Sequence, residues 1–176
     1  MKHVVVDTNV VVVANGSHAD VSPDCVIRCV DRLQALMKKG KVVIDDAHRI
    51  LKEYERNTSS RRGKGPGDVF VLWLLRNKAN IRHVRQVPLT EPTPDTFDEF
   101  PDAVLQPSID PPDRKFLAVA AAHPGRAAVW HATDSKWLDW WQPLKAAGVT
   151  VDFLCPEDVC RFYASKFPDR DLPALP

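Results

Sequence analysis

Apolar residues recur with two different periods along this chain. Short β-branched runs such as residues 3–6 are typical of strands that are buried on both faces of a parallel sheet. Longer stretches such as residues 24–39 place apolar side chains at helical spacing. We expect strands at residues 3–6, 41–44, 82–87, 127–131 and 149–154. We expect helices at residues 24–39, 111–123, 135–147 and 156–166, one from Asp45 or Asp46 to Arg56, and one starting at Asp68.

The alternation of these strands and helices predicts an α/β fold. Helices that connect parallel strands cross over the sheet and cover its two faces, which gives three layers around a central parallel sheet. The 176 residues contain no clear linker and no internal repeat. Because this length suits one domain of ordinary size, we expect a single domain over residues 1–176.

Charge changes this picture only locally, because the formal net charge is +1. Such a chain is not a strongly basic polyanion binder. A basic segment nevertheless precedes an acidic, proline-rich one. The basic residues are Arg56, Arg61, Arg62, Lys64, Arg76, Lys78, Arg82 and Arg85, and the acidic residues are Glu91, Asp95, Asp98, Glu99 and Asp102. These are either ordinary solvated surfaces, or a basic loop around Arg61, Arg62 and Lys64 that binds an RNA backbone and a mobile acidic loop that competes with it.

Two further features bear on the cellular location. The most apolar stretch, residues 4–14, is interrupted by an acid and is too short to cross a bilayer. We therefore expect a cytoplasmic protein with no membrane contact. Neither a CxxC zinc pair nor a small secreted disulfide framework matches the cysteines, which are Cys25, Cys29, Cys155 and Cys160. We expect buried, reduced thiols.

Four acidic residues occupy positions where strands end or helices begin. Asp7 directly follows the first strand, where burial of its charge is costly unless it is paired, hydrogen-bonded or bound to a metal. Asp134 follows the fourth strand, Glu53 lies in the helix after the second, and Asp113 lies in the first turn of a later helix. Sites in open α/β sheets form at the carboxyl ends of strands, so these acids are candidates for one shared site.

The residues around these acids resemble the ordered motifs of the PIN-domain ribonucleases. The resemblance rests on VVVDTNVVV, ILKEYERN, DPPDRKFLAVAAA and HATDSKWL, followed by GVTVDFLCPEDVCRF. It covers residues 2–162 and is most specific in DTN and in the spacing Asp113-x-x-Phe116-Leu117-Ala118. It implies a three-layer fold with a central parallel sheet and a metal-dependent nuclease site.

The resemblance also implies roles for individual side chains. Thr8 and Asn9 match the polar residues that flank the first acid, and they are expected near the substrate. Glu55 stays open as an alternative to the helical acid of the family. Lys136 stands where many members carry a further acid, which argues against a second tightly held metal. The acidic quartet of the family, which holds the metal and carries catalysis, is matched by Asp7, Glu53, Asp113 and Asp134.

Convergent carboxylates suit a hard divalent cation. Mg²⁺ takes oxygen ligands and keeps several waters, and a bound Mg²⁺ or Mn²⁺ can activate water and stabilise charge on a scissile phosphate. The sequence thus predicts a divalent-metal-dependent endoribonuclease that hydrolyses RNA, of the kind that acts as the toxin of a bacterial toxin–antitoxin pair. An antitoxin protein and a second copy of the chain in a homodimer are the protein partners that this prediction allows.

Each of these features also has a purely structural interpretation. Asp7 and Asp134 could cap a following turn or helix, Asp113 could interact with a helix dipole, and Glu53 could pair with an arginine on its own helix. Three tryptophans within residues 137–141 indicate core packing, with a stacking platform for bases as the alternative. The alternative function is a PIN-like module that binds RNA or protein without catalysis.

Overall fold

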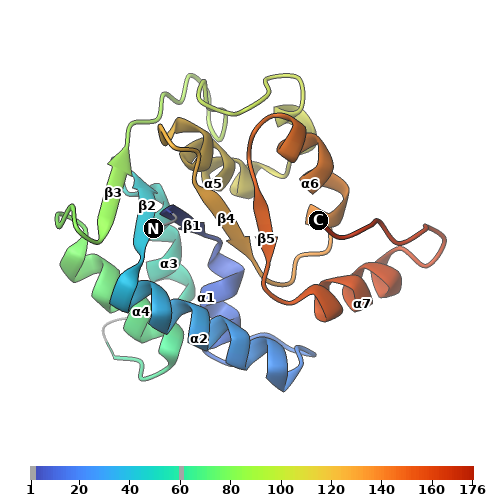
Figure 1. The fold of residues 1–176 in the computed structure, drawn as a ribbon, viewed down its shortest axis with the longest axis horizontal. Helices are drawn as coiled ribbons and strands as arrows, with labels where there is room; N and C mark the ends of the chain where they lie inside the picture. The colour runs from blue at the N-terminus through green and yellow to red at the C-terminus, as the bar shows by residue number, and fades with distance from the viewer. Residues whose placement is uncertain (1–2, 60–61) are drawn as a thin grey trace.

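A five-stranded parallel sheet forms the centre of the computed structural model, which describes residues 3–59 and 62–176 (Figure 1). The strands follow the order β3-β2-β1-β4-β5 across the sheet. They are β1 (His3–Val6), β2 (Lys41–Asp45), β3 (Val84–Val87), β4 (Ala128–His131) and β5 (Val151–Phe153). The predicted α/β fold with a central parallel sheet between layers of helices is confirmed.

Helices cover the sheet from both faces. Their bounds are α1 (Thr8–Ala14), α2 (Pro23–Lys39), α3 (Arg49–Asn57), α4 (Pro66–Asn77), α5 (Pro111–Ala122), α6 (Trp137–Ala146) and α7 (Pro156–Lys166), with a short 3₁₀ helix, η1 (Gln106–Ser108). α2 packs on β2, and α5 packs on β1, β2 and β4 from the opposite face (Figure 1). No helix in the described part of the chain is long and apolar enough to span a bilayer.

β1 lies at the centre of the sheet because its apolar side chains are buried on both faces. Val4 is in register with Val42 of β2 on one side and with Ala128 of β4 on the other. The chain leaves β1 toward β2 and β3, and it later returns to the other side of β1 to form β4 and β5. The carboxyl ends of β1 and β4 therefore flank the point where the strand order reverses, which is where ligands bind in such sheets.

α1 is the element that the sequence pattern does not predict. Its valines are β-branched and disfavour helices, yet Val10, Val11 and Val13 are fully buried in one. Asp7 is the N-cap, and its side chain accepts a hydrogen bond from the Asn9 N–H. Burial of the valines thus outweighs their weak helix propensity, and α1 turns the chain immediately after β1.

α4 lies close against α1 because of one glycine. A Cβ on Gly67, in the first turn of α4, would overlap the backbone oxygen of Val11. Beside it, Asn15 Nδ2 donates to Asp68 Oδ1 over 2.9 Å, and Asp68 N donates to Asn15 Oδ1 over 3.0 Å. Asp68 also accepts from the N–H of Ser59. These bonds attach the segment between α3 and α4 to the end of α1.

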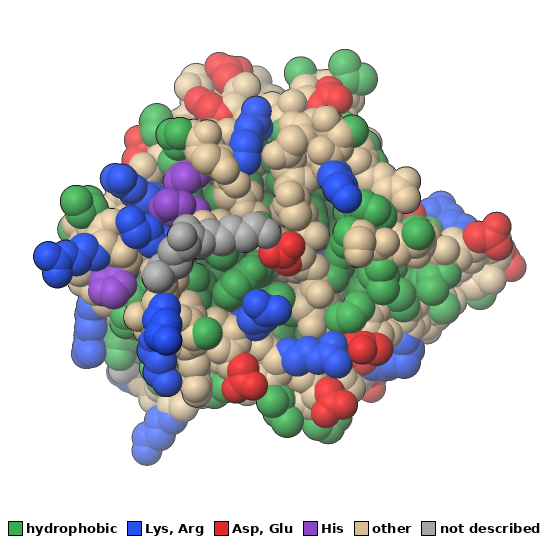
Figure 2. All heavy atoms as spheres, in the orientation of Figure 1, with side chains coloured by type: hydrophobic (Ala, Val, Ile, Leu, Met, Phe, Trp, Pro, Cys, Tyr) green, Lys and Arg blue, Asp and Glu red, His purple; other side chains and the backbone are tan. Residues whose placement is uncertain are grey.

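The acidic loop is not free to lie over the basic segment, and that prediction is wrong. Phe97 and Phe100 are buried in the core, and Glu91 forms an ion pair with Arg49 at 2.7 Å. Gln106 both donates to and accepts from the backbone of Phe97. Figure 2 shows acidic side chains at the top of the view, whereas Lys and Arg side chains gather on the side that carries β3.

The cysteines also differ from the prediction. Cys25 of α2 and Cys155, which precedes α7, form a disulfide, while Cys29 and Cys160 are free. The two bonded residues are 130 positions apart, and their spacing in the sequence gives no sign that the fold brings them together. By contrast, the three tryptophans of residues 137–141 are at most 9% exposed, so their predicted role in packing is confirmed.

Asp45 holds the start of α3, which begins later than the sequence suggested. Its buried carboxylate accepts from Arg49 N over 2.8 Å and from Ile50 N over 3.0 Å. We expect Asp45→Ala to lower the free energy of unfolding by about 2 kcal/mol, because both N–H groups lose a charged acceptor. Urea denaturation measures this loss. The exposed neighbour Asp46 is the matched control, and an equal loss in Asp46→Ala would contradict the prediction.

Candidate functional site

A cleft of about 660 Å³ opens where the carboxyl ends of β1 and β4 lie side by side. Residues from α1, α3, α5, α7 and the loop after β4 line it. All four predicted acids are among the lining residues: Asp7, Glu53, Asp113 and Asp134. The fold therefore gathers four carboxylates from four separate segments in one place.

Asp7 is held by two polar side chains at the end of β1. Only 4% of Asp7 is exposed. Its Oδ2 accepts from Asn9 Nδ2 over 2.9 Å and lies 2.7 Å from His131 Nδ1. Asn9 Oδ1 also accepts from the N–H of Ala132, which links α1 to the loop after β4. Asp7 is thus both the cap of α1, as the structural interpretation proposed, and a fixed part of the cleft.

His131 is a site residue that the sequence analysis missed. It is the last residue of β4 and is fully buried. Its Nδ1 faces Asp7, and its Nε2 donates to the backbone oxygen of Asp134 over 2.9 Å. The imidazole of His131 therefore holds both the carboxylate of Asp7 and the backbone of Asp134. Its position in the sequence could have indicated this role, because His131 is the last residue of a buried strand and Asp7 directly follows another.

Glu53 is paired with a lysine from another helix. Its Oε1 accepts from Thr8 Oγ1, and its Oε2 forms an ion pair with Lys115 Nζ. Lys115 is 7% exposed and also donates to the backbone oxygen of Pro112. The pairing with an arginine on the same helix is wrong. Lys115 lies two residues after Asp113, and no pattern in the sequence indicated that it reaches Glu53.

The register of α3 decides which of its two glutamates faces the cleft. Tyr54 is fully buried, and its hydroxyl donates to the backbone oxygen of Val6. This contact ties α3 to the end of β1 and brings the preceding residue, Glu53, to the cleft. Glu53 lines the cleft and Glu55 does not.

The position of Asp113 disfavours the charged form of its carboxyl. Burial, together with the nearby charges of Asp7, Asp134 and Asp110, raises the pKa of its carboxyl to about 8, against a smaller lowering by Lys115. Asp113 lies in the first turn of α5, where the helix dipole favours an anion. Burial and repulsion together exceed that contribution, so this carboxyl holds its proton near neutral pH when no cation is bound.

Asp134 lies in the turn that precedes α6. Its Oδ1 accepts from Lys136 N over 3.1 Å, so it stabilises this turn, although α6 itself begins at Trp137. The side chain of Lys136 forms an ion pair with Asp110. The sequence resemblance would place a further acid at the position of Lys136. This chain instead has a cation there, which is paired with Asp110 at the edge of the site.

The donor set of the cleft fits a hard divalent cation. Its acids offer oxygen ligands, and the raised pKa of Asp113 records charge that a cation would compensate. Within residues 3–59 and 62–176, however, no three carboxylates bring their oxygens within 4.8 Å of one another. Such an arrangement suits Mg²⁺ or Mn²⁺ held by one or two carboxylates, with waters bridging to the others.

The predicted substrate-binding residues divide into two groups. Thr8 and Asn9 line the cleft, whereas Arg62 and Lys64 are exposed in the segment between α3 and α4. Arg61 lies outside the described residues. A polar groove along that segment shares Asn57 with the cleft. Its lining residues are Asn15, Ser17, Arg56, Asn57, Thr58, Ser59, Gly65 and Asp68.

The wall of the cleft formed by α7 carries an aromatic and a cationic side chain instead of carboxylates. Phe162 and Lys166 of α7 lie there together with His18, which precedes α2. The rings of His18 and Phe162 are 5.8 Å apart. The sequence analysis did not single out these residues, because only the fold brings the segment before α2 to α7.

Comparison of the chain with models of known protein families, with curated proteins and with solved structures finds no match. The geometry of the cleft and the chemistry of its side chains are therefore the basis for a functional assignment.

The pKa of Asp113 makes the stability of the metal-free protein depend on pH. The folded state holds this proton up to about pH 8, whereas the ordinary pKa is 3.8. The unfolded state thus binds fewer protons between these values, so stability falls as the pH rises through this interval. We expect Asp113→Asn to remove the part of the loss of stability with rising pH that this carboxyl causes. Melting temperatures in EDTA at pH 5 and pH 8 measure it, with the exposed Asp46→Asn as control. Parallel pH profiles in parent and Asp113→Asn would contradict the prediction.

Proposed function

We propose that this chain is a PIN-like, divalent-metal-dependent endoribonuclease. The observation that supports it most directly is the gathering of Asp7, Glu53, Asp113 and Asp134 in one cleft at the switch point of the sheet. A structural role explains single acids, such as the cap that Asp7 provides. It does not explain why Asp113 is partly buried beside three other carboxylates, which is costly unless a cation is also bound there.

Each polar side chain of the cleft has a task in this proposal. One or two of Asp7, Asp113 and Asp134 would bind the cation directly, and the others would reach it through bound water. Glu53 would be a further ligand or an acceptor for bound water. When bound, Mg²⁺ or Mn²⁺ supplies an activated water and stabilises charge on the scissile phosphate. Asn9 and His131 orient Asp7. Thr8 and Lys115 fix the carboxylate of Glu53.

RNA is the substrate class that the surroundings of the acids support. Lys166 places a cation on the wall opposite the carboxylates, and the rings of His18 and Phe162 offer flat surfaces to an unpaired base. The polar groove that joins the cleft at Asn57 leads toward Arg62 and Lys64. Such side chains contact phosphates and position a strand without reading its sequence.

A second candidate is a PIN-like module that binds RNA or protein without cutting it. Two ion pairs favour this alternative, because Lys115 neutralises Glu53 and Lys136 neutralises Asp110 without any metal. The two candidates differ in one measurable property. The nuclease requires a divalent cation for activity, whereas the module binds its ligand equally well in a chelator.

The remaining parts of the proposal concern the cellular setting. We place the activity in the cytoplasm and regard the chain as a toxin-type nuclease, for which an antitoxin protein would be the natural inhibitor. A homodimer is a further assembly that this class of function allows. The toxin role and its partners derive from the sequence resemblance, whereas the cytoplasmic location derives from the short, interrupted apolar stretch of residues 4–14.

Substitution of Asp7 tests catalysis directly. Asp7→Asn keeps the shape of the side chain but removes a ligand charge. We expect RNA cleavage to fall by roughly a hundredfold or more, since a bound metal supplies several kcal/mol of charge stabilisation. We also expect the rise in melting temperature on adding Mg²⁺ or Mn²⁺ to disappear, because that rise reflects binding to the native state alone.

Asp139→Asn is the matched control for this experiment. Asp139 lies on α6, where it accepts a hydrogen bond from the hydroxyl of Tyr163, and it does not line the cleft. This variant is expected to cleave RNA at the parent rate. If purified Asp7→Asn also cleaves at the parent rate in metal-defined buffer, the nuclease proposal fails. If the parent protein binds RNA equally in EDTA and never cleaves it, the binding module takes its place.

The exposed cations beside the groove are expected to contribute to RNA affinity through counterion release. The double variant Arg62→Gln, Lys64→Gln is expected to lower the slope of log Kd against log salt for single-stranded RNA by about 1.4, or roughly 0.7 per lost phosphate contact. Lys38→Gln, Lys39→Gln, at the far end of α2, changes the net charge equally and is the control. An unchanged slope in the first variant would remove this segment from the RNA path.

A further inference from the structure

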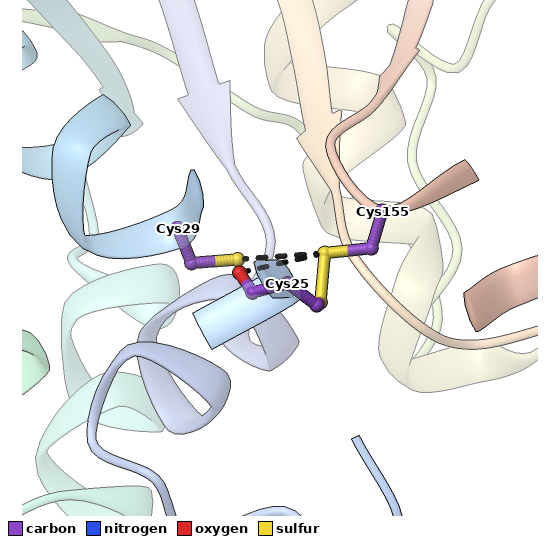
Figure 3. Close-up of side chains that lie close together, drawn as sticks. All are labelled: Cys25, Cys29 and Cys155. Carbon is purple, nitrogen blue, oxygen red and sulfur yellow. Dashed lines mark hydrogen bonds between the residues drawn. A yellow bond between two sulfur atoms is a disulfide. The ribbon is translucent and has the colours of Figure 1, made fainter. Parts of the chain in front are cut away.

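Three cysteine sulfurs cluster beside the cleft wall, and the proposed nuclease function uses none of them. Cys25 and Cys29 lie one turn apart on α2, and Cys155 lies between β5 and α7 (Figure 3). The three Sγ atoms lie within 4.8 Å of one another. Cys25 and Cys155 form the disulfide, and the free Sγ of Cys29 lies 3.9 Å from that of Cys155. A structural crosslink needs only two cysteines, so the third thiol requires its own explanation.

Burial decides which thiol can reach this disulfide. None of the three cysteines is more than 2% exposed, so thiols in solution cannot approach either sulfur of the bond in the folded protein. Exchange of a disulfide requires a thiolate in contact with one of its sulfurs. Cys29 is already in that position, whereas the fourth cysteine, Cys160, lies outside the cluster.

We propose that these three residues form an intramolecular thiol–disulfide exchange site, in which Cys29 can replace Cys25 as the partner of Cys155. Cys29 loses its proton and its sulfur bonds to Cys155 Sγ. The bond between Cys25 and Cys155 breaks, and Cys25 leaves as a thiolate that takes up a proton. One disulfide and one thiol remain, so the step needs no external oxidant or reductant.

The environment of Cys29 makes this exchange slow. Burial raises the pKa of its thiol to about 12, and the negative charge of Asp158 acts in the same direction. Little thiolate is therefore present at neutral pH, and the rate follows the thiolate fraction. Such a site holds one linkage for long periods and changes it only when the region opens or the thiol is deprotonated.

The exchange affects elements that form the cleft. Cys155 directly precedes α7, which contributes Phe162 and Lys166 to the cleft wall. Moving the bond from Cys25 to Cys29 shifts the attachment point of α7 by one helical turn along α2. The position of this wall would then depend on which of the two disulfides is present. The exchange itself does not depend on the nuclease activity.

The sequence provides a direct way to measure the two linkages. Trypsin cuts after Arg28, which separates a peptide of residues 3–28 with Cys25 from a peptide of residues 29–32 with Cys29. Cys155 lies in a peptide of residues 146–161. In a Cys160→Ser background, the folded protein is incubated at pH 8 without oxygen. Samples taken over time are unfolded in acid with N-ethylmaleimide, digested and analysed by mass spectrometry.

We expect one alkylated thiol per chain, first on Cys29 and increasingly on Cys25, until the two reach a constant ratio. The variant that also carries Cys29→Ser has no exchanging thiol and is expected to show the Cys25–Cys155 link alone. The variant that carries Cys25→Ser instead is reduced, unfolded and refolded with oxidised glutathione, and it is expected to form a Cys29–Cys155 link. Circular dichroism compares the folds of the variants, and the Cys29–Cys155 link can form only if the two sulfurs meet.

Three results would each overturn the proposal. One is alkylation that stays confined to Cys29 throughout the incubation. Another is a Cys25→Ser protein that forms no Cys29–Cys155 link. The last is a protein in which all three thiols stay reduced after oxidised glutathione, including one that binds a single Zn²⁺ through them, as native mass spectrometry with added Zn²⁺ would reveal. RNA cleavage is not measured, so failure here leaves the proposed function untouched.

Discussion

The cost of placing several carboxylates side by side in a partly buried cleft is the constraint on which the rest of the cleft depends. Burial and the negative charges of Asp7, Asp134 and Asp110 together raise the pKa of Asp113 at the start of α5. The fold answers this repulsion with neutral or cationic partners from neighbouring elements. Asn9 and His131 hold Asp7, while Lys115 pairs with Glu53. These partners reduce the electrostatic cost, but for Asp113 they provide only the smaller effect of Lys115.

The sheet topology explains why the acids meet. β1 is the central strand, and the chain places β2 and β4 on either side of it in parallel. Every residue that follows β1 or β4 is therefore delivered to the same edge of the sheet. α1 then turns the chain away at once, with Asp7 as its cap. One side chain thus begins a helix and contributes to the cleft, so its structural and functional interpretations are both compatible with the geometry.

The sequence predicted the sheet, most helices and the positions of the four acids, because these features follow from local periodicity and strand ends. It could not predict α1, since burial in the folded protein outweighs the low helix propensity of valine. It also missed Lys115, His131 and the Cys25–Cys155 disulfide. Each of these acts on a residue from a distant segment, and such pairs become visible only when the topology is known.

The acids of the cleft differ in the charge of the side chains beside them, and this affects how each could bind a metal. Glu53 already has a buried cation beside it, so a metal at Glu53 would have to displace Lys115 or share the carboxylate with it. Asp113 has neighbouring negative charges instead, and a cation there would relieve repulsion that Lys115 offsets only in small part. Under the proposed function, the largest gain in free energy on metal binding therefore arises around Asp113, Asp7 and Asp134. Glu53, fixed by Thr8 and Lys115, is better placed to orient a water than to anchor the metal.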